Sequence, residues 1–572
     1  MTAENWTVRL DGSTLPDRRL IGGKAWSIAR MRAMDLPVPP AFVITTQACL
    51  AYLEQGAFPA GLEAEIDAGL AWLDAATGRQ FGGAERPLLL SVRSGAAISM
   101  PGMMDTVLNL GIDDAAEAAL AAESGLPDFA RDTHRRFLEL YASIVLKLPV
   151  ELDHAASPQS WREQVAAPAT PREALLGAVR AVFESWNTRR AKRYRDHNNI
   201  PHDMGTAVTI QAMVFGNLDE HSGTGVLFSR NPLTGEPLPY GEYLPRAQGE
   251  DVVSGKFTPL GLDAMAAMEP EAHAALLAAC ARLEAEHRDI QDIEFTVQSG
   301  VLYLLQARSA KRAPDAAVRA AVDMVSEGLI DVGQALARVS PEQVRALLLP
   351  RLGSGALDAA AVAAQGEGAC PGVACGVVVT DPDEAERRAR TGEAVVLVRS
   401  TTSPDDIHGM IAAVAVVTEQ GGSTSHAAVV SRALGRPCVV GVGVGKGPQP
   451  GAIVTVDGES GRVYAGQLPV EMPDEAADAR LARLIDWARA RSAVQVLRPA
   501  DAGGLEGCVD VDAQLSDGEA DGLKSLLHGA VAAKGAALAN PDTARLARAQ
   551  GVRTIVTEPV LPALLAMIEE VA

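Results

Sequence analysis

The sequence has no apolar run long enough to span a membrane, no recognisable signal peptide and no excess of basic residues. Its 51 lysines and arginines face 72 acidic residues, which gives a net charge of −21. A nucleic-acid backbone requires a basic face, so we expect no general nucleic-acid binding, although a local cationic pocket for a nucleotide is compatible with this charge. We likewise expect no membrane location.

Cysteine is also scarce. Six cysteines are scattered over 572 residues, without the regular spacing of a disulfide framework. Cys370 and Cys375 have a C-x4-C spacing, but no second pair of ligands accompanies them, which argues against zinc. Together with the absence of a signal peptide, this pattern predicts a cytoplasmic protein.

The length of the chain exceeds that of one ordinary hydrophobic core, and 48% hydrophobic with 22% charged residues is typical of a folded globular protein. The motifs below divide the chain into four regions, residues 1–312, 313–365, 366–468 and 469–572. We expect a multidomain α/β (α+β) protein.

The most informative stretch leads to His426. An apolar run, residues 411–417, is followed by Gly421–Gly422 and three hydroxyl residues, 423–425, before His426 and an alanine-rich pattern. This order predicts a strand, a tight turn and a helix start. The hydroxyls are N-cap candidates, and the positive helix end stabilises an anion and disfavours imidazolium. The pattern favours a phosphohistidine, whereas an isolated histidine there would more often be a satisfied side chain.

Two segments of the first region are candidates for phosphate binding. Gly22–Gly23 and Lys24 precede an amphipathic pattern, which suggests a turn that brings a lysine near phosphates, although a solvated lysine is the commoner role of such a tripeptide. Residues 88–92 predict a strand, followed by Arg93 and a segment of small residues that allows close approach to a ligand. A lid over a triphosphate and an ordinary loop both fit that segment.

Residues 292–297 and 301–307 predict a β-hairpin through Ser299–Gly300. Alternation places Asp292 and Glu294 on one face of the first strand. It places Gln306 and Arg308 on one face of the second strand. Carboxylate and amide oxygens suit magnesium, and an arginine beside them suits a phosphate. A salt-bridged sheet surface is the alternative. Glu250 and Asp251 stand together in an earlier glycine-rich stretch and could bind magnesium, orient a nucleophile or be solvated.

The stretch GGSTSHAAVVSRALGRPCVVG closely resembles the phosphohistidine signature of the phosphoenolpyruvate-utilising enzymes, in particular the pyruvate phosphate dikinase family. Residues 18–312 resemble that family's nucleotide-binding domain, an ATP-grasp fold. The resemblance implies that ATP is bound by Lys24, Arg93, Asp292, Glu294, Gln306 and Arg308, with Glu294 and Gln306 coordinating Mg2+. It further implies phosphate-binding roles for Arg136, Glu250 and Asp251. Thr424 matches a position that is phosphorylated for regulation in plant members.

The remaining regions follow from periodicity and from the same resemblance. Residues 313–352 show apolar residues at helical spacing, with a separate short helix from Ser340–Pro341, and lead into an alanine- and glycine-rich linker. Residues 366–468 alternate valine-rich strands with helices, as in the family's swivelling phosphohistidine domain. A complete barrel of the family type needs about 250 residues. We therefore expect residues 469–572 to form a small α/β tail that cannot by itself interconvert pyruvate and phosphoenolpyruvate.

These features predict a phosphotransferase that uses ATP and phosphate to phosphorylate its own His426, releasing AMP and pyrophosphate. The acceptor of the final phosphoryl group is expected on a separate barrel-containing subunit, another protein or a small molecule. Two alternatives remain open at this point. One is a water-dependent dikinase or an antibiotic phosphotransferase, and the other is an ATP-sensing phosphocarrier or regulatory protein without turnover.

Overall fold

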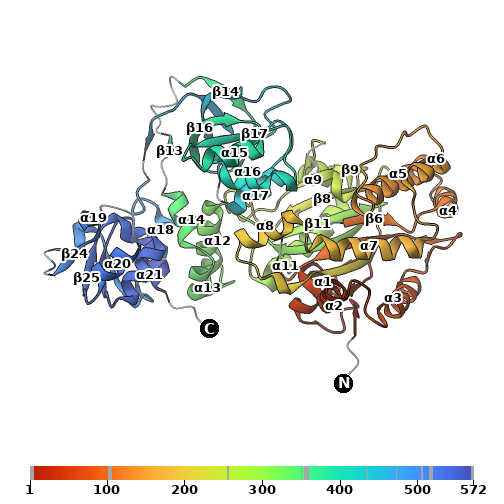
Figure 1. Ribbon diagram of the computed structural model, residues 1–572, viewed down its shortest axis with the longest axis horizontal. Coiled ribbons are helices and arrows are strands. Elements are labelled where there is room, and N and C mark those ends of the chain that lie inside the picture. The colour runs from red at the N-terminus through yellow and green to blue at the C-terminus, as the bar shows by residue number, and fades with distance from the viewer. Residues whose placement is uncertain are drawn as a thin grey trace.

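The computed structural model describes residues 5–98, 100, 106–253, 257–348, 351–352, 360–434, 436–471, 473–503, 505, 507–514 and 520–568. Figure 1 shows the first half of the chain in red to light green, with a teal domain beside it. Green helices lie between this first half and the blue C-terminal part. Across the ranges given, every helix is too short or too polar to cross a bilayer.

The first lobe is built on an antiparallel sheet that the helices cover. Its centre is β7 (Ala207–Ala212), which is buried along its whole length. The sheet has the order β1 (Thr7–Arg9), β2 (Ala41–Ile44), β7, β5 (Leu90–Gly95), β6 (Thr106–Leu110). A short ladder joins β3 (Gln80–Phe81) to β4 (Pro87–Leu88). The helices are α1 (Arg18–Ala33), α2 (Thr46–Gln55), α3 (Leu62–Thr77), α4 (Asp114–Ser124), α5 (Pro127–Ile144), α6 (Pro158–Val165), α7 (Pro171–Ser185) and α8 (Arg189–His197).

The second lobe is a further antiparallel sheet. Its order is β10 (Leu260–Gly261), β9 (Tyr240–Pro245), β8 (Gly223–Phe228), β11 (Gln291–Gln298), β12 (Val301–Ser309). The β11–β12 pair confirms the predicted hairpin, and its turn uses positive φ at Ser299 and Gly300. The helices described beside the sheet are α9 (Gly249–Val253), α10 (Leu262–Met268) and α11 (Pro270–His287).

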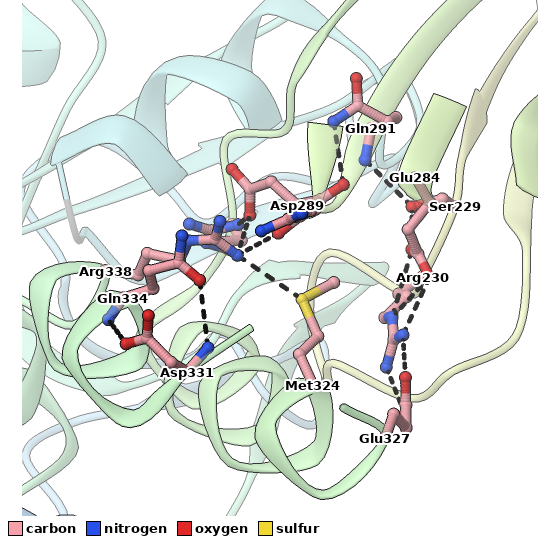
Figure 2. Close-up of polar contacts among 12 residues, drawn as sticks. Ser229, Arg230, Glu284, Asp289, Gln291, Met324, Glu327, Asp331, Gln334 and Arg338 are labelled. Carbon is pink, nitrogen blue, oxygen red and sulfur yellow. Dashed lines mark hydrogen bonds and ion pairs between the residues drawn. The ribbon is translucent and has the colours of Figure 1, made fainter. Parts of the chain in front are cut away.

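Three helices follow, as the periodicity of residues 313–352 predicts: α12 (Pro314–Ser326), α13 (Val332–Ala337) and α14 (Pro341–Leu347). A capping box at Ser340 starts the last of them. Figure 2 shows how α12 is tied to the second lobe. The buried Arg230 guanidinium lies between Glu284 of α11, at 2.8 Å, and Glu327 at the end of α12, at 2.5 Å. These helices are therefore a fixed extension of the second lobe.

The next domain contains an eight-stranded mixed sheet. Its order is β14 (Val362–Gln365), β21 (Arg462–Ala465), β20 (Ile453–Asp457), β16 (Val373–Val379), β17 (Val395–Arg399), β18 (Ala415–Thr418), β19 (Cys438–Val440), β15 (Glu367–Cys370). Its helices are α15 (Pro382–Ala389), α16 (Ile407–Ala412) and α17 (His426–Leu434). The chain enters and leaves this domain through a two-stranded ladder of β13 (Arg351–Leu352) with β22 (Val470–Glu471).

The C-terminal part has a parallel four-stranded sheet with helices, and so contains more strands than the two βα fragments suggest. The order is β23 (Gln495–Leu497), β26 (Thr554–Val556), β25 (Ala532–Lys534), β24 (Cys508–Asp510). Its helices are α18 (Ala479–Arg489), α19 (Val511–Gln514), α20 (Ala520–Leu527), α21 (Pro541–Ala549) and α22 (Leu561–Met567). One apolar cluster joins this part to α12–α14, so its core is continuous with that of the connecting helices.

Two local expectations were wrong. The apolar run 411–417 does not form one strand, because α16 continues to Ala412 and β18 starts only at Ala415. Both α16 and β18 bury apolar residues. A continuous apolar run in the sequence therefore does not show where a buried helix ends and a buried strand begins. Arg93 does not follow its strand but lies inside β5. Its backbone pairs with Thr209 of β7, which fixes the direction of its side chain.

Candidate functional site

A cavity of about 220 Å³ lies between the sheets of the two lobes. Strands β5, β6 and β7 line it from the first lobe, and β8, β11 and β12 line it from the second. Three predicted ligands, Lys24, Arg93 and Glu294, contribute to its wall. The cavity therefore combines apolar strand residues with two cations and one carboxylate, as a pocket for an anionic nucleotide requires.

The Gly-Gly-Lys turn is a kink in α1. Gly22 has φ 75° and ψ 164° between helical neighbours, and a Cβ there would come within 2.0 Å of the Gly95 carbonyl oxygen. Only glycine combines this positive φ with such a close approach. The kink holds α1 against the end of β5, where Gly23 N–H donates to the Ala96 carbonyl at 2.9 Å. Lys24 therefore enters the cavity beside β5.

The hairpin brings its four predicted ligands together. Asp292 is paired with Arg308 and Glu294 with Gln306 across the β11–β12 ladder. Arg308 Nε donates to Asp292 Oδ2 at 2.8 Å. Arg93 Nη2 reaches from the first lobe to Glu294 Oε2 at 2.8 Å and to Gln306 Oε1 at 3.5 Å. The two lobes are thus joined through an arginine at the wall of the cavity.

The charges of the hairpin acids fit a bound cation. Burial acts to raise the pKa of Glu294, but Arg93, Arg308 and Lys24 outweigh it and hold that pKa below its usual value. Burial raises the pKa of Asp292, against the opposing effect of Arg308. Among the described residues, the buried Oδ1 of Asp292 has no hydrogen-bond partner. An ionised carboxylate opposite an amide oxygen, with an unpartnered carboxylate oxygen nearby, is a donor set suited to Mg2+. No group of three or more His, Cys, Asp or Glu side chains arranged for a metal occurs in the described ranges.

The residues expected to bind phosphate are partly brought together. Arg136 of α5 contacts both Asp132 at 2.7 Å and Asp251 at 3.2 Å. Asp251 also accepts a hydrogen bond at 3.0 Å from the backbone of Gln248, a residue that lines the cavity. The side chain of Glu250 lies outside the described residues. Arg136 and Asp251 thus form an ion pair beside one part of the cavity.

His426 is the first residue of α17, as predicted. Its Nδ1 lies 3.1 Å from Thr402 Oγ1, while its Nε2 is covered and has no hydrogen-bond partner among the residues described. The ring as a whole is half-buried. Burial lowers the pKa of His426, although Asp406 opposes the shift. When Nδ1–H donates to Thr402, the lone pair resides on Nε2, which makes that atom a nucleophile.

The loop before His426 is bound to the second lobe. Thr424 Oγ1 donates a short hydrogen bond to Glu242 of β9, and Ser423 Oγ contacts the same carboxylate at 3.1 Å. Tyr240, also on β9, lies 2.6 Å from Ser423 Oγ. A Cβ on Gly422 would come within 2.8 Å of Glu242, so this glycine permits the approach. Figure 1 shows α17 at the edge of the second lobe, near β8 and α8.

These contacts change the role expected for the hydroxyl residues. Ser423 and Thr424 are buried and face Glu242 rather than the first turn of α17. Ser425 provides the carbonyl that accepts the first helical hydrogen bond, from Val429. Sequence reasoning missed Glu242, Tyr240 and Thr402, since nothing in their local patterns indicates a partner 24 to 183 residues away.

An apolar contact and an ion pair extend this interface. Ala96, Met100 and Trp186 of the first lobe share one buried cluster with Ala427 and Ala428 of α17. At its edge, two residues of opposite charge, Arg190 and Asp405, lie 3.7 Å apart. The histidine domain is therefore docked on the two lobes that enclose the cavity, through both polar and apolar contacts.

Comparisons with known proteins match two segments of the chain. Residues 18–80 and 57–262 match the pyruvate phosphate dikinase AMP/ATP-binding domain. Residues 391–461, which include His426, match the mobile domain of the PEP-utilising enzymes. The first match covers the lobes that enclose the cavity up to β10, and the second covers the sheet and helix around the histidine.

Several curated relatives are pyruvate, phosphate dikinases. That of Rhizobium meliloti (strain 1021) is 42% identical over 545 residues, covering 85% of this chain and 60% of the relative. Pyruvate, phosphate dikinase 2 of Oryza sativa subsp. japonica is 43% identical over 522 residues, covering 84% and 58%. That of Clostridium symbiosum is 38% identical over 540 residues, covering 87% and 62%. The chain thus spans about three-fifths of the length of these relatives.

Proposed function

Because the chain carries the AMP/ATP-binding domain of pyruvate phosphate dikinase and the mobile phosphohistidine domain of the PEP-utilising enzymes, we propose that it is an ATP-dependent phosphotransferase that phosphorylates itself on His426. The observation that carries this proposal is the docking of the histidine loop. Glu242 and Tyr240 hold Ser423 and Thr424, while Nε2 of His426 is covered and has no hydrogen-bond partner in the part of the chain that the structure describes.

ATP binds in the cavity between the lobes. Lys24 and Arg93 lie at its wall and contact the phosphates, and Arg308 acts from the hairpin beside them. Their positive charge offsets the charge that builds up on the phosphoryl oxygens in the transition state, so positioning and electrostatics supply most of the rate. Glu294 and Gln306 would hold Mg2+, with Asp292 beside them. Bound Mg2+ would screen the phosphate charges and polarise the transferred group.

His426 is the nucleophile. Nε2 is covered in this docked arrangement, so the mobile domain must first shift to expose it. With Nδ1–H directed to Thr402, the exposed Nε2 then attacks the β-phosphorus of ATP, AMP leaves, and the histidine carries a pyrophosphoryl group. Inorganic phosphate, bound near Arg136, accepts the terminal phosphoryl group and departs as pyrophosphate, which leaves phospho-His426. The final acceptor is a small molecule or a site on another domain or protein, reached when the mobile domain leaves the nucleotide-binding lobes.

Labelled ATP tests this reaction directly. Incubation with Mg2+ and β-32P-ATP is expected to label the wild-type protein and not a His426→Asn variant. Omitting phosphate is expected to change the bound group from phosphoryl to pyrophosphoryl and to abolish pyrophosphate release. A reaction that releases phosphate from ATP without added phosphate would instead indicate a water-dependent dikinase.

The non-turnover alternative predicts a different pattern. A nucleotide sensor would bind ATP tightly, with no label on the wild type and no AMP formed. A Lys24→Met variant separates binding from chemistry, because it should weaken ATP binding while His426 and its docking contacts remain intact. Loss of label in His426→Asn with normal ATP affinity supports the transferase, whereas equal labelling of both proteins contradicts it.

A further inference from the structure

Two cysteines face each other beneath the helix that begins at His426. Cys370 ends β15 and Cys438 begins β19, and the two are directly paired in the antiparallel ladder. Both side chains are fully buried, and neither forms a disulfide. Directly paired residues on antiparallel strands have Cα atoms about 4.5–5.5 Å apart, and disulfides span Cα distances of about 4.4–6.8 Å. The pairing, which follows a β-bulge between Gly368 and Cys370, is therefore compatible with the Cα separation that a disulfide requires.

The two thiols lie on the face of the sheet that α17 covers. Cys438 and Val440 share a buried cluster with Ala428 of α17, whereas Val439 packs into the cluster on the opposite face. Arg432 of α17 donates from Nη1 to the carbonyl of Ala369, next to Cys370, at 3.0 Å. A bond between the thiols would consequently form directly under the helix that carries the histidine.

Burial keeps the pair reduced and unreactive in the docked arrangement. It raises the pKa of Cys370 to about 12 and that of Cys438 to about 11. The hydroxyl of Ser431 offsets part of the effect at Cys438, and Arg432 offsets part of it at both thiols. Thiolates are the reactive species in disulfide exchange, so protonated buried thiols exchange slowly.

Docking covers the edge of the sheet where this pair lies. β15 is an edge strand, and Glu367 at its start contacts Tyr240 of the second lobe at 3.1 Å. Cys370 also belongs to the apolar cluster that includes Ala96 and Met100 of the first lobe. Departure of the mobile domain would remove these neighbours and leave β15 as an open edge, which can fray.

We propose that Cys370 and Cys438 are a redox-active dithiol that closes to a disulfide when the mobile domain is undocked, by exchange with a low-molecular-weight disulfide such as oxidised glutathione. The undocking step rests on the proposed function. One cysteine thiolate attacks oxidised glutathione, forming a mixed disulfide and releasing one glutathione thiolate. The second cysteine thiolate attacks the protein sulfur of that mixed disulfide and releases the other glutathione. Two electrons and two protons pass from the pair to glutathione.

Intact mass and peptide mapping after equilibration in glutathione redox buffers test the pair. The wild-type chain is expected to lose two hydrogens and to yield a cross-linked peptide containing both cysteines. Cys370→Ser and Cys438→Ser should lack this product. Cys375→Ser is the matched control, because Cys375 is half-buried on β16 of the same sheet, with β17 and β18 between it and the pair, and it should behave as the wild type. A pair that stays reduced, or a disulfide to another cysteine, would overturn the assignment.

The rate of closure tests protection by docking. Glu242→Ala removes the carboxylate that holds Ser423 and Thr424. In this variant the Cys370–Cys438 disulfide is expected to form at least fivefold faster than in the wild type. Equal rates would show that docking does not protect the pair. Because the readout is mass, these results are independent of whether His426 accepts a phosphoryl group from ATP.

Discussion

The hydroxyl of Thr424 donates to the carboxylate of Glu242, so the residue two positions before His426 is bound to a strand of the nucleotide-binding region. Ser423 contacts the same carboxylate. Docking of the mobile domain therefore depends on a short segment immediately before the proposed nucleophile. Contacts that position a domain in this way are expected to affect the rate of phosphoryl capture more than the affinity for ATP.

Replacing Glu242 with alanine should slow labelling of His426 by β-32P-ATP about 30-fold, because hydrogen bonds to a charged group contribute about 2 kcal/mol. The dissociation constant for ATP, measured by calorimetry, should stay within about twofold, since Glu242 does not line the cavity. Glu236→Ala serves as the control, because Glu236 is an exposed acid that pairs with Arg319 in the same region. Unchanged labelling of Glu242→Ala would contradict the docking role.

The pH dependence of labelling should reflect the lowered pKa of His426. An exposed imidazole protonates near pH 6.5, but the buried ring stays neutral, and hence nucleophilic, as the pH falls through that value. Labelling in single-turnover experiments should therefore persist at pH 6.5 and decline only at lower pH, where Nε2 becomes protonated. A half-maximal rate at or above pH 6.5 would show that burial does not depress this pKa in solution.

Thr402 should act through His426 without contacting ATP itself. A Thr402→Val variant loses the partner of Nδ1, and with it the orientation and tautomer of the ring. A neutral hydrogen bond contributes about 1 kcal/mol, so we expect roughly fivefold slower labelling at unchanged ATP affinity. Thr402→Ser restores the hydroxyl and should recover the rate. Failure of serine to rescue labelling would indicate that the threonine matters for packing.

Arg230 should contribute to the stability of the chain rather than to phosphoryl transfer. Its buried guanidinium lies between Glu284 and Glu327 (Figure 2), and an Arg230→Met variant leaves both carboxylates without it. Breaking a buried ion pair costs about 3 kcal/mol or more, which urea unfolding monitored by circular dichroism would detect. The more exposed Arg319→Met should cost less than about 1 kcal/mol. Similar losses of unfolding free energy for the two variants would argue against a stabilising role of Arg230 between the two carboxylates.

Local patterns were sufficient to predict those parts of the site that lie on single elements. Alternation places Asp292 with Glu294 on one face of the first strand, and Gln306 with Arg308 on one face of the second. Their pairing across the ladder depends in addition on a β-bulge between Glu294 and Phe295, which shifts the register by one residue and which the two-residue turn does not predict. Likewise, the glycine pair and the hydroxyl residues predict a helix start at His426, and α17 begins there.

The contacts between elements could not be read in the same way. Arg93 and Glu294 are 201 residues apart, and their ion pair depends on the packing of one sheet against another. The bond from Thr424 to Glu242 spans 182 residues and exists only while two domains are docked. Turn chemistry and periodicity describe a residue's own element, whereas these partners are chosen by tertiary packing.

The pairing of β13 with β22 places the entrance and exit of the histidine domain side by side. A segment whose two ends meet can be removed from, or inserted into, a host chain without disturbing the host's fold. The histidine domain is in this sense a cassette. The parts of the chain before and after this domain share one apolar core, which joins α12–α14 to the C-terminal sheet and its helices. The histidine domain and the rest of the chain therefore have a physical basis for folding independently of each other.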